Sequence, residues 1–205
     1  MSYKHIIFDV DGTLLDSEKA TITALQETIR ELKNKEVPYE DLKFTYGIPG
    51  FTGLAKLGFE NTDEALLVWN KYIAKNKWMV DWFKGLKDVV VELGKRGYEL
   101  GIVTSRVDFE LEADAKIFDF YQYFRIMVNS CDTSRHKPYG DPLIKYLELA
   151  NIKKEEALYL GDTEYDYLCA RNAGVDFLHA KWGSYLVLDG ARTVDHPEDL
   201  LEILK

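Results

Sequence analysis

The sequence is short of basic residues, of cysteine and of long apolar runs. Its 205 residues include 26 lysines and arginines against 35 acidic residues, a net charge of −9. Because nucleic acids and anionic membranes are bound by basic surfaces, neither is expected as a partner. No apolar run approaches membrane-spanning length, and the first apolar segment begins too early for a signal peptide to precede it. We therefore expect a cytoplasmic protein.

Cysteine is nearly absent. Cys131 and Cys169 are the two present, and they lie far apart in the sequence. A disulfide framework and a cysteine-based metal site are thereby excluded, and we expect two buried free thiols. There is also no internal repeat and no low-complexity tail. The length fits one domain, or a core domain that carries a modest insertion.

The most informative segment is 5–16, HIIFDVDGTLLD. Its apolar run 6–8 predicts a buried strand of a parallel sheet, and Gly12 lets the chain turn away sharply. Asp9 and Asp11 then stand at the carboxyl end of that strand, where open α/β sheets bind ligands. Since residues i and i+2 of a strand share a face, both carboxylates are directed to one small volume. Taken alone, an Asp-Gly pair is more typical of an ordinary turn or helix cap.

Helical periodicity dominates from residue 17 to residue 83, and strands alternate with helices thereafter. We predict strands at 98–103, 124–128, 157–160 and 175–180, with helices at 86–93, 109–118, 142–150, from 163, and 197–204. Alternation with short loops predicts an α/β fold with a doubly wound parallel sheet. The predicted domains are a catalytic core (1–16 and 84–205) and an inserted all-helical cap (17–83).

Polar residues recur where the predicted strands end. They are Asp9 and Asp11, then Thr104 and Ser105, then Gly161 and Asp162, with Asp166 four residues further on. Asp162 and Asp166 would face the same way at the start of a helix, although a cap plus a solvated acid explains that pair equally well. If the strands are neighbours, four carboxylates converge, and their repulsion requires a cation. Oxygen ligands of this kind suit Mg²⁺, and we predict Asp9, Asp11, Asp162 and Asp166 as its ligands.

A carboxylate beside Mg²⁺ can attack phosphorus and form an aspartyl-phosphate. Asp9 is the candidate nucleophile, and Asp11 is the candidate general acid and base. For the phosphate oxygens, Thr104 offers a hydroxyl and Ser105 a backbone N–H near a helix start. Lys137 could neutralise both the phosphate and Asp9. Individually, Thr104 is as consistent with a strand-end cap, and Lys137 with a solvated lysine.

These residues together resemble the four motifs of the haloacid dehalogenase-like superfamily. The matching segments are Asp9-x-Asp11, Thr104 in GIVTS, Lys137 in RHKP, and Gly161-Asp162-x-x-x-Asp166. The resemblance implies that Asp11 also binds the metal through its backbone carbonyl, and that Asp166 acts through water or through Lys137. Its order of segments is similar to the phosphoglycolate phosphatase and pyrophosphatase group, which implies a Mg²⁺-dependent phosphatase. One departure is Gly140, where relatives usually carry proline, and we expect a looser loop there.

Two other functions share parts of this pattern. A phosphomutase similar to beta-phosphoglucomutase has the same core, but its cap histidine has no counterpart, because no histidine occurs between His5 and His136. A receiver-like signalling module has an acidic pair and a lysine, but it lacks the helical insertion. We expect a small phosphorylated substrate, substrate discrimination by the loop at 46–50, and a monomer or weak homodimer.

Overall fold

The computed structural model describes residues 3–46, 48, 50–184 and 186–205. The chain divides into two compact units, Met1–Leu15 with Trp82–Lys205, and Asp16–Asp81. The predicted cap boundaries at 17 and 83 differ from this division by one residue and by two. Where the chain passes between the units, the two-residue strands β2 (Leu15–Asp16) and β3 (Asp81–Trp82) pair with each other.

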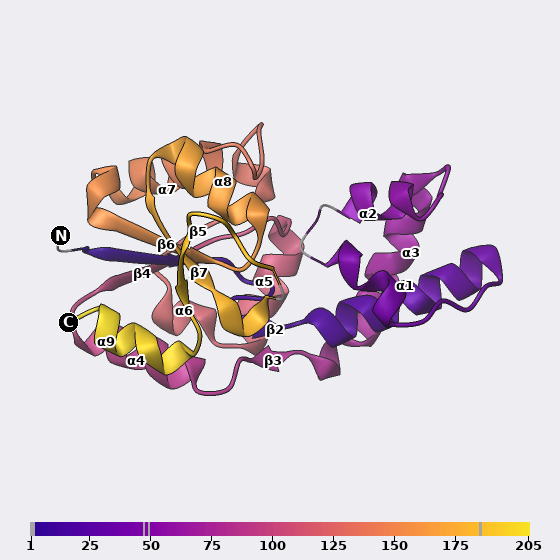
Figure 1. Cartoon of the computed structure of the whole chain (residues 1–205), viewed down its shortest axis with the longest axis horizontal. Helices are drawn as coiled ribbons and strands as arrows, with labels where there is room; N and C mark the ends of the chain where they lie inside the picture. Colours follow the sequence, from indigo (N-terminus) through magenta and orange to yellow (C-terminus); the bar gives the residue numbers. More distant parts are fainter. Residues whose placement is uncertain (1–2, 47, 49, 185) are drawn as a thin grey trace. The chain divides into compact units, whose positions relative to one another are not determined.

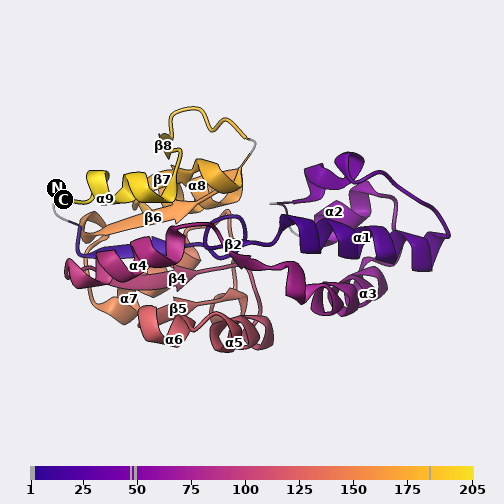
Figure 2. The same ribbon diagram turned by 90° about the horizontal axis from the view of Figure 1, so that it is seen from below.

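The larger unit is built on a six-stranded sheet whose order is β5-β4-β1-β6-β7-β8. All of its strand pairs are parallel, which confirms the predicted doubly wound α/β fold. The strands are β1 (His5–Phe8), β4 (Glu99–Val103), β5 (Ile126–Val128), β6 (Ala157–Gly161), β7 (Asp176–Ala180) and β8 (Arg192–Val194). The order can be followed across the sheet in Figure 2. Strand β8 was not predicted, because a three-residue segment with two exposed side chains has too little pattern to detect.

Strand β1 lies at the centre of the sheet, between β4 and β6. Its apolar residues Ile6, Ile7 and Phe8 are fully buried, as an apolar run flanked by two parallel strands requires. Phe8 stands opposite Ile102 on one side and Leu160 on the other. The carboxyl ends of β1, β4 and β6 therefore meet at the same edge.

Helices cover both faces of the sheet (Figure 1). Helices α7 and α8 lie on one face, and α4 and α9 on the other. The helices are α4 (Leu86–Lys95), α5 (Asp108–Ile117), α6 (Phe120–Tyr123), α7 (Asp141–Ala150), α8 (Glu164–Ala173) and α9 (Leu200–Ile203). Short 3₁₀ turns occur at Ser130–Asp132, Lys154–Glu156, Lys181–Gly183 and Pro197–Asp199. The predicted helix at 197–204 is thus a 3₁₀ turn followed by α9.

The smaller unit has a helical core of its own. Its helices are α1 (Glu18–Lys33), α2 (Gly50–Lys56) and α3 (Thr62–Lys75), with 3₁₀ turns at Glu40–Thr45 and Lys77–Met79. The apolar stripe of α1 is buried at Ile22, Leu25 and Ile29, which recur at three- and four-residue steps. Trp69 of α3 packs in this core, and its indole N–H donates to the carbonyl of Thr21 at 3.0 Å. The predicted discriminating loop at 46–50 includes residues 47 and 49, which lie outside the described residues.

The structure corrects one expectation about the thiols. Cys169 is buried in α8, but Cys131 is exposed in the 3₁₀ turn after β5, where Asn129 caps the backbone. Among the described residues, no helix has both the length and the apolarity needed to span a membrane.

Candidate active site

The carboxyl edge of the sheet gathers three of the predicted site residues directly after their strands. Asp9 follows β1, Thr104 follows β4 and Asp162 follows β6. The Asp9 N–H donates to the carbonyl of Leu160 at 2.9 Å, and the Thr104 N–H donates to the carbonyl of Val128 at 3.0 Å. These two bonds extend the parallel ladders by one residue, so each side chain is held at the edge by the sheet itself.

Three carboxylates converge at this edge. Asp9, Asp162 and Asp166 each place an oxygen within 4.8 Å of the others, and all three residues are buried. Thr163 brings Asp166 back toward the strand end, because it caps α8. Its hydroxyl accepts from the Asp166 N–H at 3.2 Å and donates to Asp166 Oδ2 at 2.6 Å. The cluster therefore consists of oxygen donors held by a strand end and a capped helix start.

Lys137 lies inside this cluster. Its Nζ donates to Asp9 Oδ1 at 2.8 Å and to Asp166 Oδ1 at 2.7 Å, and its side chain is 3% exposed. Burial acts to lower the pKa of Lys137, but Asp166 and Asp9 raise it above its ordinary value. The lysine is therefore a permanent cation. Lys137 lies in the loop before α7, whereas Asp9 follows β1 and Asp166 lies in α8.

One lysine does not neutralise three acids. Burial raises the pKa of Asp9 to about 7 against the action of Lys137, and Asp166 adds to the shift. Burial also raises the pKa of Asp162 well above its usual range. For Asp166, burial acts upward, but Lys137 holds its pKa below the ordinary value. An added cation would stabilise the ionised form of carboxylates that resist ionisation in a dry cluster. The donor set therefore fits a divalent metal ion.

These pKa shifts predict how stability depends on pH when metal is removed. The pKa of Asp9 is about 7 in the folded chain against an ordinary 3.8, so between these values the folded state holds more protons than the unfolded state. The free energy of unfolding should therefore lose a contribution as pH rises through this range. With a chelator present, Asp9→Asn should raise the melting temperature more at pH 8 than at pH 5.5, by a few degrees. An equal effect at both pH values would contradict this assignment.

Asp11 does not join the carboxylate cluster. Its two oxygens are held by Arg106, with Nε 2.8 Å from Oδ2 and Nη2 2.6 Å from Oδ1. The Nη1 of Arg106 contacts Asp114, which is fully buried in α5. Sequence reasoning missed both partners. Arg106 directly follows the Thr104-Ser105 segment, and this position next to a predicted strand end is the one signal that could have drawn attention to it.

The turn after β1 is fitted tightly to Asp162. Gly12 has φ +72°, and a Cβ at this position would lie 2.2 Å from Asp162 Oδ2. Only glycine meets both demands. Thr13 donates from its hydroxyl to Asp162 Oδ1 at 3.1 Å, and the Trp182 indole N–H donates to the Thr13 carbonyl at 2.9 Å. Thr13 and Trp182 thus support the turn that carries Asp11, and neither was singled out from the sequence.

The two predicted phosphate-binding residues after β4 differ in exposure. Thr104 is buried, and its hydroxyl accepts from the Arg106 N–H at 3.3 Å. Ser105 is exposed, and it lies three residues before the first residue of α5. Its N–H is thus one turn ahead of the helix start, at the same strand end as Thr104.

Tyr159 and Gly140 have structural roles in the larger unit. Tyr159 of β6 donates from its hydroxyl to Asp166 Oδ1 at 2.8 Å, and a tyrosine inside a strand gave no sign of this role. Gly140 does not loosen its loop, contrary to expectation. It is buried, and a Cβ there would lie 2.6 Å from the Ala173 nitrogen, so the glycine lets the start of α7 pack against the end of α8. Close backbone contact is the physical reason for the correction.

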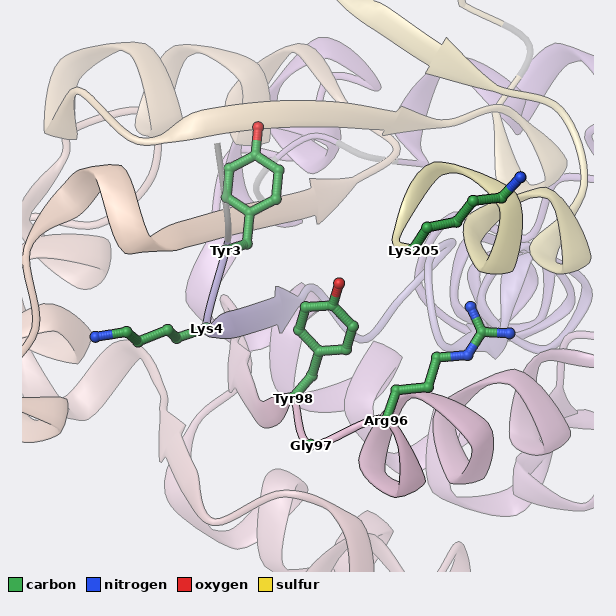
Figure 3. Close-up of a pocket in the computed structure, with 6 residues that line it drawn as sticks. All are labelled: Tyr3, Lys4, Arg96, Gly97, Tyr98 and Lys205. Carbon is green, nitrogen blue, oxygen red and sulfur yellow. The ribbon is translucent and has the colours of Figure 1, made fainter.

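A hollow of about 630 Å³ lies at the opposite edge of the sheet, before the start of β1 (Figure 3). It is lined by Tyr3, Lys4, Arg96, Gly97, Tyr98 and Lys205. Its cations are already used by the fold. Arg96 pairs with Glu92 and donates to the carbonyl of Leu201 at 2.6 Å, and Lys205 pairs with Glu202 at 2.8 Å. We therefore assign the chemistry to the carboxyl edge.

Comparison with known proteins finds similarity to one family of hydrolases. The model of the haloacid dehalogenase-like hydrolase family matches residues 6–180. The pyrophosphatase PpaX of Bacillus mycoides is 27% identical over 183 residues, covering 89% of this chain and 85% of that protein. A protein of Caldanaerobacter subterraneus, assigned by prediction as the same pyrophosphatase, is 29% identical and covers 100% and 94%. A crystal structure from Lactobacillus plantarum, of a protein assigned by prediction as a phosphoglycolate phosphatase, has a TM-score of 0.87 at 28% identity and covers 99% and 100%.

Proposed function

The chain belongs to the haloacid dehalogenase-like hydrolases, and from this we propose that it is a Mg²⁺-dependent phosphatase acting on a small phosphorylated metabolite. The observation that carries the proposal is the buried cluster of Asp9, Asp162 and Asp166 around Lys137. Three acids and one fixed cation at the carboxyl edge of a parallel sheet suit the transfer of a dianionic phosphoryl group. The resemblance to phosphoglycolate phosphatases and pyrophosphatases supports the same class of substrate.

Asp9 is the proposed nucleophile. Lys137 donates to Oδ1 of Asp9, which orients the carboxylate and favours its ionised form, while an oxygen of Asp9 attacks phosphorus. The bond from phosphorus to the leaving oxygen breaks, and that oxygen takes a proton from Asp11. The resulting aspartyl-phosphate is then hydrolysed by a water molecule whose proton returns to Asp11. Thr104, the Ser105 N–H and Lys137 are the proposed partners of the phosphate oxygens.

The cluster fits a magnesium ion by the chemistry of its donors. Asp9 and Asp162 are the proposed carboxylate ligands, together with the backbone carbonyl of Asp11, as the family resemblance implies. Both oxygens of Asp166 already accept hydrogen bonds from Lys137, Tyr159 and Thr163, so we assign it an indirect role. When bound, the ion would offset the negative charge that Asp9 and the phosphate bring together.

The test of this proposal is metal-dependent release of phosphate. We expect no turnover of a panel of phosphate esters and pyrophosphate in excess chelator, full recovery with Mg²⁺, and little recovery with Ca²⁺. Ca²⁺ prefers more ligands and longer bonds than this compact cluster offers. The measurement is free phosphate over time, with Asp162→Asn as a variant in which Mg²⁺ affinity by calorimetry should fall at least tenfold. Undiminished activity in chelator would refute the metal site.

A further inference from the structure

Arg106 is held both at its backbone and at its guanidinium, apart from its contact with Asp11. Its backbone N–H donates to the Thr104 hydroxyl at 3.3 Å, and its backbone carbonyl accepts from the N–H of Ser130 at 2.9 Å. On the far side of the guanidinium, Asp114 is fully buried and pairs with Nη1. Arg106 itself is 13% exposed. The arginine is therefore a built feature of the site, held at its backbone and by a buried acid.

The two acids that share Arg106 differ in accessibility. Asp114 has no exposed surface, whereas the side chain of Asp11 is 37% exposed. Asp11 occupies the Nε–Nη2 edge through two parallel hydrogen bonds, which is the geometry by which arginine binds a free carboxylate or phosphate. A guanidinium keeps its charge at every pH at which proteins fold, so this edge stays cationic.

The proposed chemistry requires Asp11 to leave this edge. A general acid must present an oxygen to the leaving group, and both oxygens of Asp11 are occupied by the two N–H groups of Arg106. An anion that replaced Asp11 at Arg106 would keep the guanidinium paired on both of its edges, because Asp114 stays in place. Such an exchange would also free Asp11 beside the leaving oxygen.

On the basis of the proposed function, we infer that Arg106 binds a second anionic group of the substrate, and that Asp11 occupies that position in the free protein. The substrate class is then a phosphate whose leaving group carries its own carboxylate or phosphate. The segment 47–50, Gly-Ile-Pro-Gly, offers no basic side chain for this purpose. Lys137 already serves Asp9 and Asp166. Arg106 is the cation at this strand end that faces an exposed acid.

The inference is tested by binding in an Asp9→Asn background, where turnover is blocked. The ligands, titrated by calorimetry with Mg²⁺ present, are 2-phosphoglycolate, pyrophosphate and methyl phosphate. Adding Arg106→Gln should weaken the first two by about 10- to 100-fold, since hydrogen bonds between charged groups are lost. Methyl phosphate, which has no second anion, should weaken by less than about threefold. A loss confined to one of the first two ligands supports the inference and identifies the anion.

Controls separate recognition from folding. Arg106→Gln combined with Asp114→Asn removes both buried charges and is used if the single variant unfolds. Arg125→Gln, at an 81% exposed arginine before β5, makes the same charge change at the opposite edge and should leave all three affinities unchanged. Equal losses for all three ligands, or none for any, would overturn the inference. If none of the three ligands binds even with Arg106 present, the proposed function fails instead.

Discussion

Replacing Asp9 by asparagine should lower turnover of any phosphate ester by a factor on the order of 10³ or more. Asparagine keeps the size of the side chain but offers no anionic oxygen to attack phosphorus. The fold should persist, because Lys137 retains Asp166 at 2.7 Å and the substitution removes one of three crowded acids. The measurement is steady-state phosphate release at saturating Mg²⁺, with thermal unfolding to verify the fold.

The matched control is Asp195→Asn, which removes an exposed acid after β8 and should leave turnover within twofold of the original chain. Asp9→Asn with rates similar to the original chain would falsify the assignment of the nucleophile. A loss of activity accompanied by unfolding would contradict the expectation that the cluster tolerates one fewer charge.

Replacing Lys137 by methionine should lower the free energy of unfolding strongly. The side chain is buried and bridges Asp9 and Asp166, so its removal leaves two buried acids without their cation. Breaking a buried ion pair by removing one partner typically costs about 3–5 kcal/mol. We expect a loss of this size in the free energy of unfolding, measured in chelator by denaturant titration, and a fall in turnover on the order of 10²-fold.

Two variants make this second prediction decisive. Lys116→Met removes a lysine whose side chain is 71% exposed and should change the free energy of unfolding by no more than about 0.5 kcal/mol. Lys137→Met combined with Asp166→Asn should recover part of the lost stability, because one uncompensated charge is removed. If the double variant were less stable than the sum of the two single changes implies, charge imbalance would not be the cause.

Much of the core could be predicted because its signals are local. Apolar runs long enough for a strand marked β1, β4 and β6, and each was followed at once by polar residues. In a parallel sheet, such ends lie at one edge whatever the exact strand order. Asp9, Thr104 and Asp162 are also neighbours because β1 lies between β4 and β6, and this order came from the structure. Strand β8 was not predicted, since its pattern is too short to distinguish from a loop.

The charge partners within the site could not be predicted. Arg106 meets Asp11 across 95 positions of sequence, and Asp114 lies on an ordinary helix. The sequence pattern predicts Asp11 as a fourth member of the acidic cluster, because a carboxylate at position i+2 faces the same side in an extended strand. The chain turns at Gly12 immediately after Asp11, however, and the side chain is directed to Arg106 instead.

The sequence by itself determined the α/β class, the approximate position of the helical unit and most of the candidate site residues, because these depend on periodicity and on residues adjacent in the chain. Only the tertiary structure decided which charges meet. It placed Lys137 between Asp9 and Asp166, set Arg106 against Asp11, and made Gly140 a packing contact. Pairings of this kind depend on distances of a few ångströms between side chains from different elements. Local sequence patterns do not specify such distances.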